Sequence, residues 1–249
     1  MKSKCAIFIQ ARMGSSRLPG KVLMKIGDKT LLEHIVLRSM KSKLATEVVV
    51  LTTVEKQDDM IAEFCKEKGM TFTRGSENDV LDRFYQASKG MNLDTIVRLT
   101  ADCPFMDPVL IDETIENLSK YKVDYSATRL PPPWERTWPI GLDIEVVRFK
   151  TLQKVWNEAV ETYQRVHVMP YIYDNPEKFK IYISECSEAI GEMRWTVDTA
   201  EDLFQLNAIY ETLENKNEYS WRNILKVVRE NYLLNWTTSD KSQKNYKQG

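Results

Sequence analysis

Three cationic side chains stand within ten residues of one another near the start of the chain. Arg12, Arg17 and Lys21 alternate with glycines and serines, directly after the apolar run Cys5–Ile9. Glycines allow backbone N–H groups to turn toward a ligand, hydroxyl groups donate to non-bridging oxygens, and cations neutralise charge. This combination is typical of a loop that binds a polyphosphate. A solvated basic loop is the alternative, and we favour it less because the cations follow a buried strand directly.

Two aspartates stand where predicted strands end, and both are candidate magnesium ligands. Asp102 comes after Thr95–Leu99, and Asp198 comes after Arg194–Val197. Magnesium prefers one or two carboxylates, with water and phosphate oxygens completing its octahedron. Asp107 precedes a proline and is better placed to cap the next helix, which leaves Asp102 for the metal.

Asp198 has a competing interpretation as a helix N-cap. Glu201 stands three residues further on, as in a capping box, and Asp198 taken alone is better explained in this way. Paired with Asp102, however, it completes the minimum set for metal-assisted nucleotidyl transfer, which is a cationic phosphate loop and two carboxylates. We therefore expect both aspartates to hold Mg²⁺.

Further residues are candidates for binding the nucleotide base or the acceptor, and each also has a structural interpretation. Gly75 and Ser76 precede a predicted helix, where they could approach a nucleotide base or ribose. Asp143 and Glu145 share one face of a predicted strand, either as a solvated face or as a wall that binds sugar hydroxyls. His167 follows at the expected acceptor side, although a lone histidine is more often structural.

Other chemistries lack support. No Ser or Cys nucleophile motif accompanies either histidine, so acyl transfer is not indicated. The phosphate loop also lacks the GxxxxGK[ST] spacing of a Walker A site. The net charge of −1 disfavours a general nucleic-acid binder, because no broad excess of cations exists.

Composition predicts a globular protein of the reducing cytoplasm. The chain has 249 residues, 43% of them apolar, which suits one large α/β domain. Its four cysteines are far apart, without metal-ligand spacing, so we expect reduced thiols. We find no signal peptide and no apolar run of 18 residues, and therefore expect no membrane span. We expect a single domain over 1–238, with elements for the acceptor and for dimerisation from about 129 onward, and a flexible polar tail over 239–249.

Strand-like and helix-like segments alternate, which predicts a mostly parallel sheet with helices on both faces. Such sheets bind ligands beyond the carboxyl ends of their strands, where the phosphate loop and Asp102 both stand. The predicted strands are Cys5–Ile9, Glu47–Thr53, Met70–Arg74, Thr95–Leu99, Val123–Thr128, Leu142–Val147, Phe179–Ser184 and Arg194–Val197. The predicted helices are Thr30–Lys41, Asp58–Lys68, 79–89, 107–120, Phe149–Ala159, Arg165–Tyr173, 199–213 and Trp221–Tyr232.

Arg129–Pro139 is rich in proline and tryptophan, which makes it too apolar for a flexible linker and unsuited to a helix. It is a stiff surface connection, or else a substrate lid or a dimer arm.

The chain resembles the cytidylyltransferases that make CMP-activated acidic sugars, which include the CMP-KDO and CMP-sialic acid synthetases. The branch that it resembles most is the spore coat polysaccharide biosynthesis protein F group. Four blocks carry this resemblance in the same order, over roughly residues 4 to 230: 10–21, 98–104, 139–145 and 194–202.

The resemblance implies a Rossmann-like nucleotide-diphospho-sugar transferase fold of the GT-A kind, CTP and an acidic sugar as substrates, Mg²⁺, and a homodimer. It implies Arg12, Lys21, Asp102 and Asp198 as catalytic residues, with both aspartates on the metal. The nucleotide-binding residues would be Gln10, Ala11, Arg12, Met13, Gly14, Ser15, Ser16, Arg17, Lys21, Arg74, Gly75, Ser76, Thr100 and Ala101. Acceptor residues vary most within the family and are not carried over from it. We expect the acceptor-binding residues of this chain to be Glu135, Arg136, Asp143, Glu145, Arg165 and His167.

One departure from the branch bears on the acceptor. The branch usually reads Arg-Glu-His-Val where this chain has Arg165, Val166, His167 and Val168. If the missing carboxylate binds the acceptor, the acceptor of this chain differs or its site is weakened.

Three alternative functions remain open. The protein could be a nucleotidyltransferase that uses another nucleoside triphosphate or a sugar phosphate, a glycosyltransferase on the same fold, or a non-catalytic nucleotide-binding protein. Glycosyltransferases of this fold usually carry Asp-x-Asp, whereas this chain has only Asp102 between Ala101 and Cys103. Val166 is the feature that keeps the non-catalytic alternative open.

Overall fold

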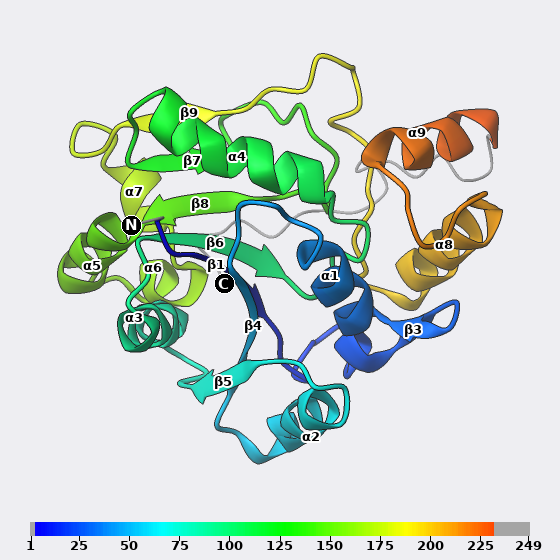
Figure 1. The fold of residues 1–249 in the computed structure, drawn as a ribbon, viewed down its shortest axis with the longest axis horizontal. Coiled ribbons are helices and arrows are strands. Elements are labelled where there is room, and N and C mark those ends of the chain that lie inside the picture. Colours follow the sequence, from blue (N-terminus) through cyan, green and yellow to red (C-terminus); the bar gives the residue numbers. More distant parts are fainter. Residues whose placement is uncertain (1–2, 232–249) are drawn as a thin grey trace.

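A seven-stranded sheet forms the centre of the computed structural model, which describes residues 3–231 (Figure 1). Its strands are β1 (Cys5–Gln10), β4 (Glu47–Thr53), β5 (Phe72–Gly75), β6 (Thr95–Thr100), β7 (Tyr125–Ala127), β8 (Glu145–Arg148) and β9 (Ile181–Ile183). Their order is β5-β4-β1-β6-β8-β7-β9, and in this sheet only β8 runs against its neighbours. The predicted α/β architecture with a mostly parallel sheet is therefore confirmed.

Both faces of β1 are buried, and this places helices on both sides of the sheet. Ile7 and Ile9 belong to one core cluster, while Ala6 and Phe8 belong to the other. Side chains alternate along a strand, so a strand that is apolar throughout needs cover on both faces. Burial of one large apolar side chain stabilises the fold by about 1.5–3 kcal/mol.

The helices divide between these two faces. The first face is covered by α1 (Leu31–Ser39), α2 (Asp59–Glu67) and α4 (Pro108–Lys120). The second is covered by α3 (Val80–Met91), α5 (Phe149–Glu158) and α7 (Pro170–Asp174). The short helix α6 (Thr162–His167) packs against α3 and α7. Beyond the first face, α8 (Ala200–Thr212) and α9 (Trp221–Glu230) pack together, and α8 contacts a ribbon of β2 (Lys25–Ile26) and β3 (Lys29–Thr30). Two 3₁₀ helices, η1 (Lys21–Leu23) and η2 (Lys56–Asp58), lie in loops.

Three helix starts that the sequence predicts are confirmed by side-chain caps. Thr30, Asp79 and Asp107 each accept a hydrogen bond from a backbone N–H in the first turn of α1, α3 and α4. Such caps stabilise a helix by about 1 kcal/mol.

The cap of α8 settles the competing interpretation of Asp198. Thr199 is the N-cap, and its partner in the capping box is Asp202. The expected pairing of Asp198 with Glu201 is therefore wrong, because both capping positions lie one residue further along the chain. The side chain of Asp198 is left outside the helix.

Two predicted strands need correction. Arg194–Val197 forms no strand, and only an isolated bridge joins Arg194 to Ile140. The strand predicted over Leu142–Val147 begins only at Glu145, because the chain around Gly141 turns at a φ of 108°. Asp143 therefore precedes β8 instead of sharing its face with Glu145.

The predicted helix Arg165–Tyr173 is two helices, α6 and α7. Val168 adopts a φ of 74°, which interrupts the helix, and Pro170 starts α7. Proline suits a first turn because the N–H that it lacks would have no partner inside the helix.

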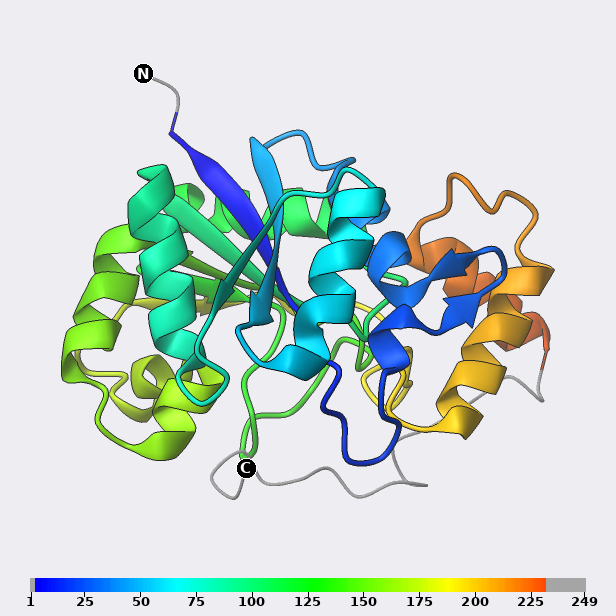
Figure 2. The same cartoon turned by 90° about the horizontal axis from the view of Figure 1, so that it is seen from below.

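The carboxyl ends of the parallel strands meet at one edge of the sheet. Figure 2 shows the loop after β1, in dark blue, and the yellow segment that leads into α8 at this same edge. The expected tail over 239–249 and the end of the predicted helix at Tyr232 lie outside the described residues. No helix within residues 3–231 is long and apolar enough to cross a membrane.

Candidate active site

A pocket of about 250 Å³ lies at the carboxyl ends of β1 and β6. It brings the loop after β1 together with residues that follow β6 and precede α8. Twelve of its lining residues are ones that we assigned to the site from sequence, and Val22 is the addition. The twelve are Gln10, Ala11, Arg12, Gly14, Ser15, Ser16, Arg17, Lys21, Thr100, Ala101, Asp102 and Asp198.

Lys21 joins the two predicted metal ligands. Its Nζ lies 2.7 Å from Asp102 Oδ2 and 2.9 Å from Asp198 Oδ1, and it also donates to Val197 O at 2.7 Å. The side chain is buried, which by itself would lower the pKa of the ammonium group. The two carboxylates outweigh burial and raise that pKa, so Lys21 stays charged.

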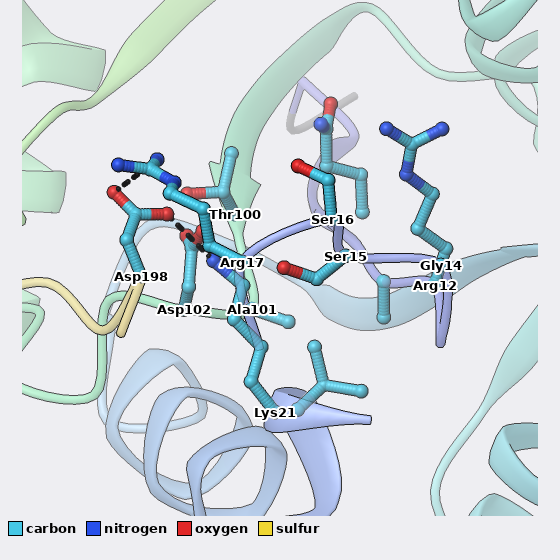
Figure 3. Close-up of a pocket in the computed structure, with 13 residues that line it drawn as sticks. Arg12, Gly14, Ser15, Ser16, Arg17, Lys21, Thr100, Ala101, Asp102 and Asp198 are labelled. Atoms are coloured by element: carbon cyan, nitrogen blue, oxygen red, sulfur yellow. Dashed lines mark hydrogen bonds and ion pairs between the residues drawn. The ribbon is translucent and has the colours of Figure 1, made fainter. Parts of the chain in front are cut away.

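Asp198 is held by two further cations. Arg17 approaches Asp198 Oδ2 at 2.9 Å (Figure 3). The buried Arg194 approaches the same oxygen at 2.5 Å. Burial would raise the pKa of Asp198, but Lys21, Arg194 and Arg17 lower it overall. The carboxylate is therefore ionised at neutral pH. We did not assign Arg194 from sequence, because a four-residue spacing predicts contact between two side chains in a helix, and the predicted element here was a strand.

Backbone contacts explain why aspartates so distant in sequence converge. Asp102 O accepts hydrogen bonds from Val197 N at 2.9 Å and from Thr196 Oγ1 at 3.1 Å. One residue earlier, Trp195 N donates to Ile140 O. The segment before α8 is therefore tied to the end of β6 by its main chain, and both carboxylates face one point.

The donor set fits a magnesium ion. Two carboxylates from different segments already converge on one cationic group, and Val197 O adds a third oxygen to the same point. Within residues 3–231 no cluster of three His, Cys, Asp or Glu side chains could hold a metal. Magnesium is the ion that tolerates so few protein ligands, since water and phosphate oxygens complete its shell.

A buried carboxylate anchors the phosphate loop. Asp58 Oδ1 accepts from Met13 N at 2.7 Å, and Asp58 Oδ2 accepts from the hydroxyl of Thr53. Asp58 is fully buried, and although it is the N-cap of α2 its side chain makes no capping bond. Met13 O in turn accepts from Ser15 N and Gly20 N, which closes the loop. Met13 thus shapes the loop without lining the pocket, and sequence reasoning missed Asp58 because an acidic helix start resembles an ordinary cap.

Arg12 lies on the other side of the pocket from Arg17 (Figure 3). Its guanidinium is half exposed and lies 3.5 Å from Glu77 in the loop before α3. Within residues 3–231 it pairs with neither Asp102 nor Asp198, and its exposure leaves it free to turn toward an anionic ligand.

The residues Arg74, Gly75 and Ser76 do not line this pocket. The Arg74 guanidinium donates to Thr53 O and Glu55 O and pairs with Asp59 at 2.7 Å, on the side of α2. Ser76 Oγ accepts from Asp79 N. The structure does not bring these three residues to the phosphate loop, and their assignment to the base stays a prediction.

Two of the predicted acceptor carboxylates are each held by an arginine. Asp143 pairs with Arg136 at 2.6 Å and with Arg129 at 3.3 Å. Burial would raise the pKa of Asp143, but Arg136 and Arg129 lower it. Glu145 is bonded to Arg98, a residue that sequence reasoning did not assign. Neither carboxylate belongs to a solvated strand face.

The remaining acceptor candidates differ in their surroundings. Arg165 forms a bidentate pair with Asp79, so it fastens α6 to the start of α3. His167 Nε2 is buried and has no hydrogen-bond partner among the described residues. Burial, and then Arg98, lower the pKa of His167, which keeps it neutral at pH 7. Val166 is half-buried beside it, and Glu135 is exposed.

Comparisons with known proteins agree with this site. A family model described as cytidylyltransferase matches residues 6–211. The chain is 33% identical over 230 residues to the spore coat polysaccharide biosynthesis protein SpsF of Bacillus subtilis, covering 90% of this chain and 93% of that protein. A solved cytidylyltransferase from Leptospira borgpetersenii has a TM-score of 0.87 and 33% identity, covering 98% of this chain and 100% of that one.

A more distant likeness shows the fold. A CMP:2-keto-3-deoxy-manno-octonic acid synthetase, solved in complex with CTP, has a TM-score of 0.62 at 18% identity, over 84% of this chain and 99% of that one. The expected Rossmann-like nucleotidyltransferase fold is thereby confirmed.

Proposed function

The chain belongs to the cytidylyltransferase family, and we propose that it transfers CMP from CTP to an acidic sugar, a nonulosonic or ulosonic acid, with release of pyrophosphate. The observation that carries this proposal is the convergence of Lys21, Asp102 and Asp198 in the pocket formed by the phosphate loop. The likeness to SpsF supports a role in the biosynthesis of a surface or spore-coat polysaccharide.

The phosphate loop binds the triphosphate. Arg12, Arg17 and Lys21 neutralise the charge that accumulates on the leaving pyrophosphate, and Ser15 and Ser16 offer hydroxyl donors. The acceptor oxygen attacks the α-phosphorus in line, and the bond from that phosphorus to the pyrophosphate oxygen breaks. The protein supplies position and charge, with no covalent intermediate, so it needs no nucleophile of its own.

Asp102 and Asp198 would hold Mg²⁺. When bound, the ion stabilises negative charge on phosphoryl oxygens and orients the reacting groups. Arg194 keeps Asp198 ionised and directed toward Asp102. Lys21 is the cation that keeps the two carboxylates together in the protein alone.

We place the acceptor toward His167, at the end of α6. Burial, and then the charges of Arg98 and Arg129, lower the pKa of His167, which supports placing the acceptor near these three residues. Cationic arginines suit the carboxylate of an acidic sugar, and the neutral imidazole suits a hydroxyl group. Asp143 and Arg136 form an ion pair near these residues. Arg165 acts indirectly, because its ion pair with Asp79 holds α6 against α3.

Assembly and location form part of the same proposal. We propose a cytoplasmic homodimer in which Arg129–Pro139 takes part, since Trp134 in this segment is 46% exposed. Light scattering after size-exclusion chromatography measures the mass directly. A monomer at micromolar concentration would contradict the dimer and leave the proposed reaction standing.

The deciding experiment measures pyrophosphate release. The protein is mixed with Mg²⁺, each nucleoside triphosphate in turn, and a panel of nonulosonic and ulosonic acids. We expect release from CTP with at least one acid, and a thermal shift that is largest with CTP. Asp102→Asn should abolish turnover without unfolding the protein, whereas Asp28→Asn, an exposed control, should not change it.

Other outcomes would favour the alternatives. Release from another triphosphate, or only with a sugar phosphate, would indicate a different nucleotidyltransferase. Binding of CTP without pyrophosphate from any acceptor would favour a non-catalytic nucleotide-binding protein, for which Val166 is the relevant departure.

A further inference from the structure

A chain of hydrogen bonds crosses four strands beneath the pocket. Tyr125 on β7 donates to Glu145 Oε1 at 2.7 Å, Glu145 Oε2 on β8 is bonded to Arg98 on β6, and Arg98 Nε donates to Gln10 Oε1 on β1 at 3.0 Å. Strand register places these side chains on one face, because Arg98 lies directly opposite Glu145. The chain ends at the pocket, which Gln10 lines.

The direction of every bond in this chain is determined. Burial, and then Glu145, raise the pKa of Tyr125 well above its usual value, so the phenol keeps its proton and donates it. A guanidinium has only donors, so the side of Gln10 that faces Arg98 can only be the amide oxygen. The NH₂ group of Gln10 is thereby turned away from Arg98.

That NH₂ group has no hydrogen-bond partner within residues 3–231, and Gln10 lines the pocket. The nitrogen is also not among the buried polar atoms that lack partners, so it is open to solvent. Thr100 lies beside it, because Gln10 and Thr100 are paired residues at the ends of β1 and β6.

We propose that Gln10 is a specificity-determining residue, and that its NH₂ group donates to an unprotonated oxygen of the bound substrate. The oxygen belongs either to the α-phosphoryl group of CTP or to the carboxylate of the acidic acceptor. Both are anions, and the cations Arg12 and Arg98 near this end of the pocket favour an anion over a neutral hydroxyl. The inference rests on the proposed function.

Arg98 and Glu145 act through Gln10 and are positioning residues. Loss of the Glu145 charge would loosen Arg98, and the amide of Gln10 could then rotate to present its oxygen to the substrate. Glu145, which we assigned to the acceptor from sequence, would on this account never touch the acceptor.

The first experiment removes the donor. Gln10→Met keeps the length of the side chain without an NH₂ group, Gln10→Glu replaces the donor by an anion, and Gln86→Met on the exposed side of α3 is the matched control. Calorimetry gives the dissociation constant of CTP with Mg²⁺, and pyrophosphate release gives the KM of KDO and of N-acetylneuraminic acid as acidic probes. For Gln10→Met we expect either the dissociation constant of CTP or the KM of the acid to rise about tenfold. The rise should be larger for Gln10→Glu and absent for the control.

The two measurements identify the oxygen. A weaker CTP complex indicates the α-phosphoryl group, whereas unchanged CTP binding with a raised KM for the acid indicates the acceptor carboxylate. Binding of CTP and KM within twofold of wild type in Gln10→Met would overturn the proposal. If the wild type binds CTP but never releases pyrophosphate, the proposed reaction is wrong. In that case, equal affinity for CTP in wild type and Gln10→Met would overturn the role of Gln10 as well.

A double-mutant cycle tests the positioning role. Glu145→Gln alone should reproduce the pattern of Gln10→Met, and it should add nothing when Gln10 is already methionine, because the two act as one unit. Thermal melts show whether each variant folds. If Glu145→Gln does not fold, Tyr125→Phe replaces it in the cycle, because it removes the hydrogen bond that Tyr125 donates to Glu145. Losses that simply add would show that Glu145 acts on structure alone and would overturn this part of the proposal.

Discussion

Lys21 Nζ lies 2.7 Å from Asp102 Oδ2, although 81 residues separate them in the chain. The ammonium also contacts Asp198, so one buried cation lies between two carboxylates. The free energy of this arrangement depends on all three charges, because the loss of either carboxylate leaves the buried ammonium with one fewer counter-charge, and the loss of Lys21 leaves Asp102 without its cation. The same three groups are those that we propose for triphosphate and metal.

Lys21→Met should lower pyrophosphate release by about 10²–10³-fold, since a cation aimed at developing negative charge is lost. It should also increase the stabilisation by Mg²⁺ without CTP, because the metal no longer competes with an ammonium group for the two carboxylates. Thermal melts with and without Mg²⁺ measure this second effect. Lys25→Met, an exposed lysine in β2, is the control. An equal Mg²⁺ shift in wild type and Lys21→Met would contradict the prediction.

Asp58→Ala should weaken CTP binding although Asp58 lies outside the pocket lining. The substitution leaves the Met13 N–H without its carboxylate partner, and an unsatisfied buried donor costs about 1–3 kcal/mol. Asp59→Ala changes the neighbouring, half-exposed aspartate and removes only its pair with Arg74, for which we expect less than about 1 kcal/mol. Urea unfolding and calorimetry with CTP give both quantities. Equal CTP affinity in the two variants would argue against the anchoring role.

Gly141→Ala should destabilise the protein by about 3 kcal/mol. Gly141 has a φ of 108°, and a Cβ atom there would lie 2.3 Å from Trp195 O. The clash would push away the segment that carries Asp198, so activity should fall as well. Gly90→Ala is the matched control, because Gly90 is exposed in α3 with nothing within 4 Å of the added carbon. Alanine there should stabilise α3 by about 0.5–1 kcal/mol. Equal unfolding midpoints for both variants would refute this explanation.

The two histidines should make stability fall in mild acid. Burial lowers the pKa of both His167 and His34 from the ordinary value of 6.5. Just below pH 6.5 the unfolded chain therefore binds more protons than the folded one, and the free energy of unfolding decreases as pH drops. Asp143 and Asp198 have lowered pKa values, so their stabilisation is lost only below the ordinary value of 3.8 and leaves this window unaffected.

His167→Gln should flatten this pH dependence in part, since His34 remains. Urea unfolding of wild type and variant from about pH 7.5 to about pH 5.5 measures the two slopes. His34→Gln is the companion variant, because His34 Nε2 bonds to Ile26 O far from the acceptor side. An unchanged slope in His167→Gln would show that its pKa is not lowered.

The local elements could be predicted from the amino-acid sequence. Apolar runs predicted β1, β4 and β6 within a residue or two, and capping residues predicted the starts of α3 and α4, because these features depend on neighbours a few residues away. The composition of the loop after β1 was likewise enough to predict a phosphate site, since its glycines, hydroxyls and cations are contiguous.

The pairing of the charged residues, in contrast, depends on contacts between segments that are far apart in the chain. Local sequence patterns predicted Asp198 as a helix cap, Asp58 as a helix start and Glu145 as part of a strand face. In the structure, contacts with other residues outside these patterns orient each of the three side chains. Lys21 and Arg194 orient Asp198, Met13 turns to Asp58, and the register of β6 against β8 sets Arg98 on Glu145. A charged group finds its partner through strand register and loop closure, and periodicity along the chain carries no information about either.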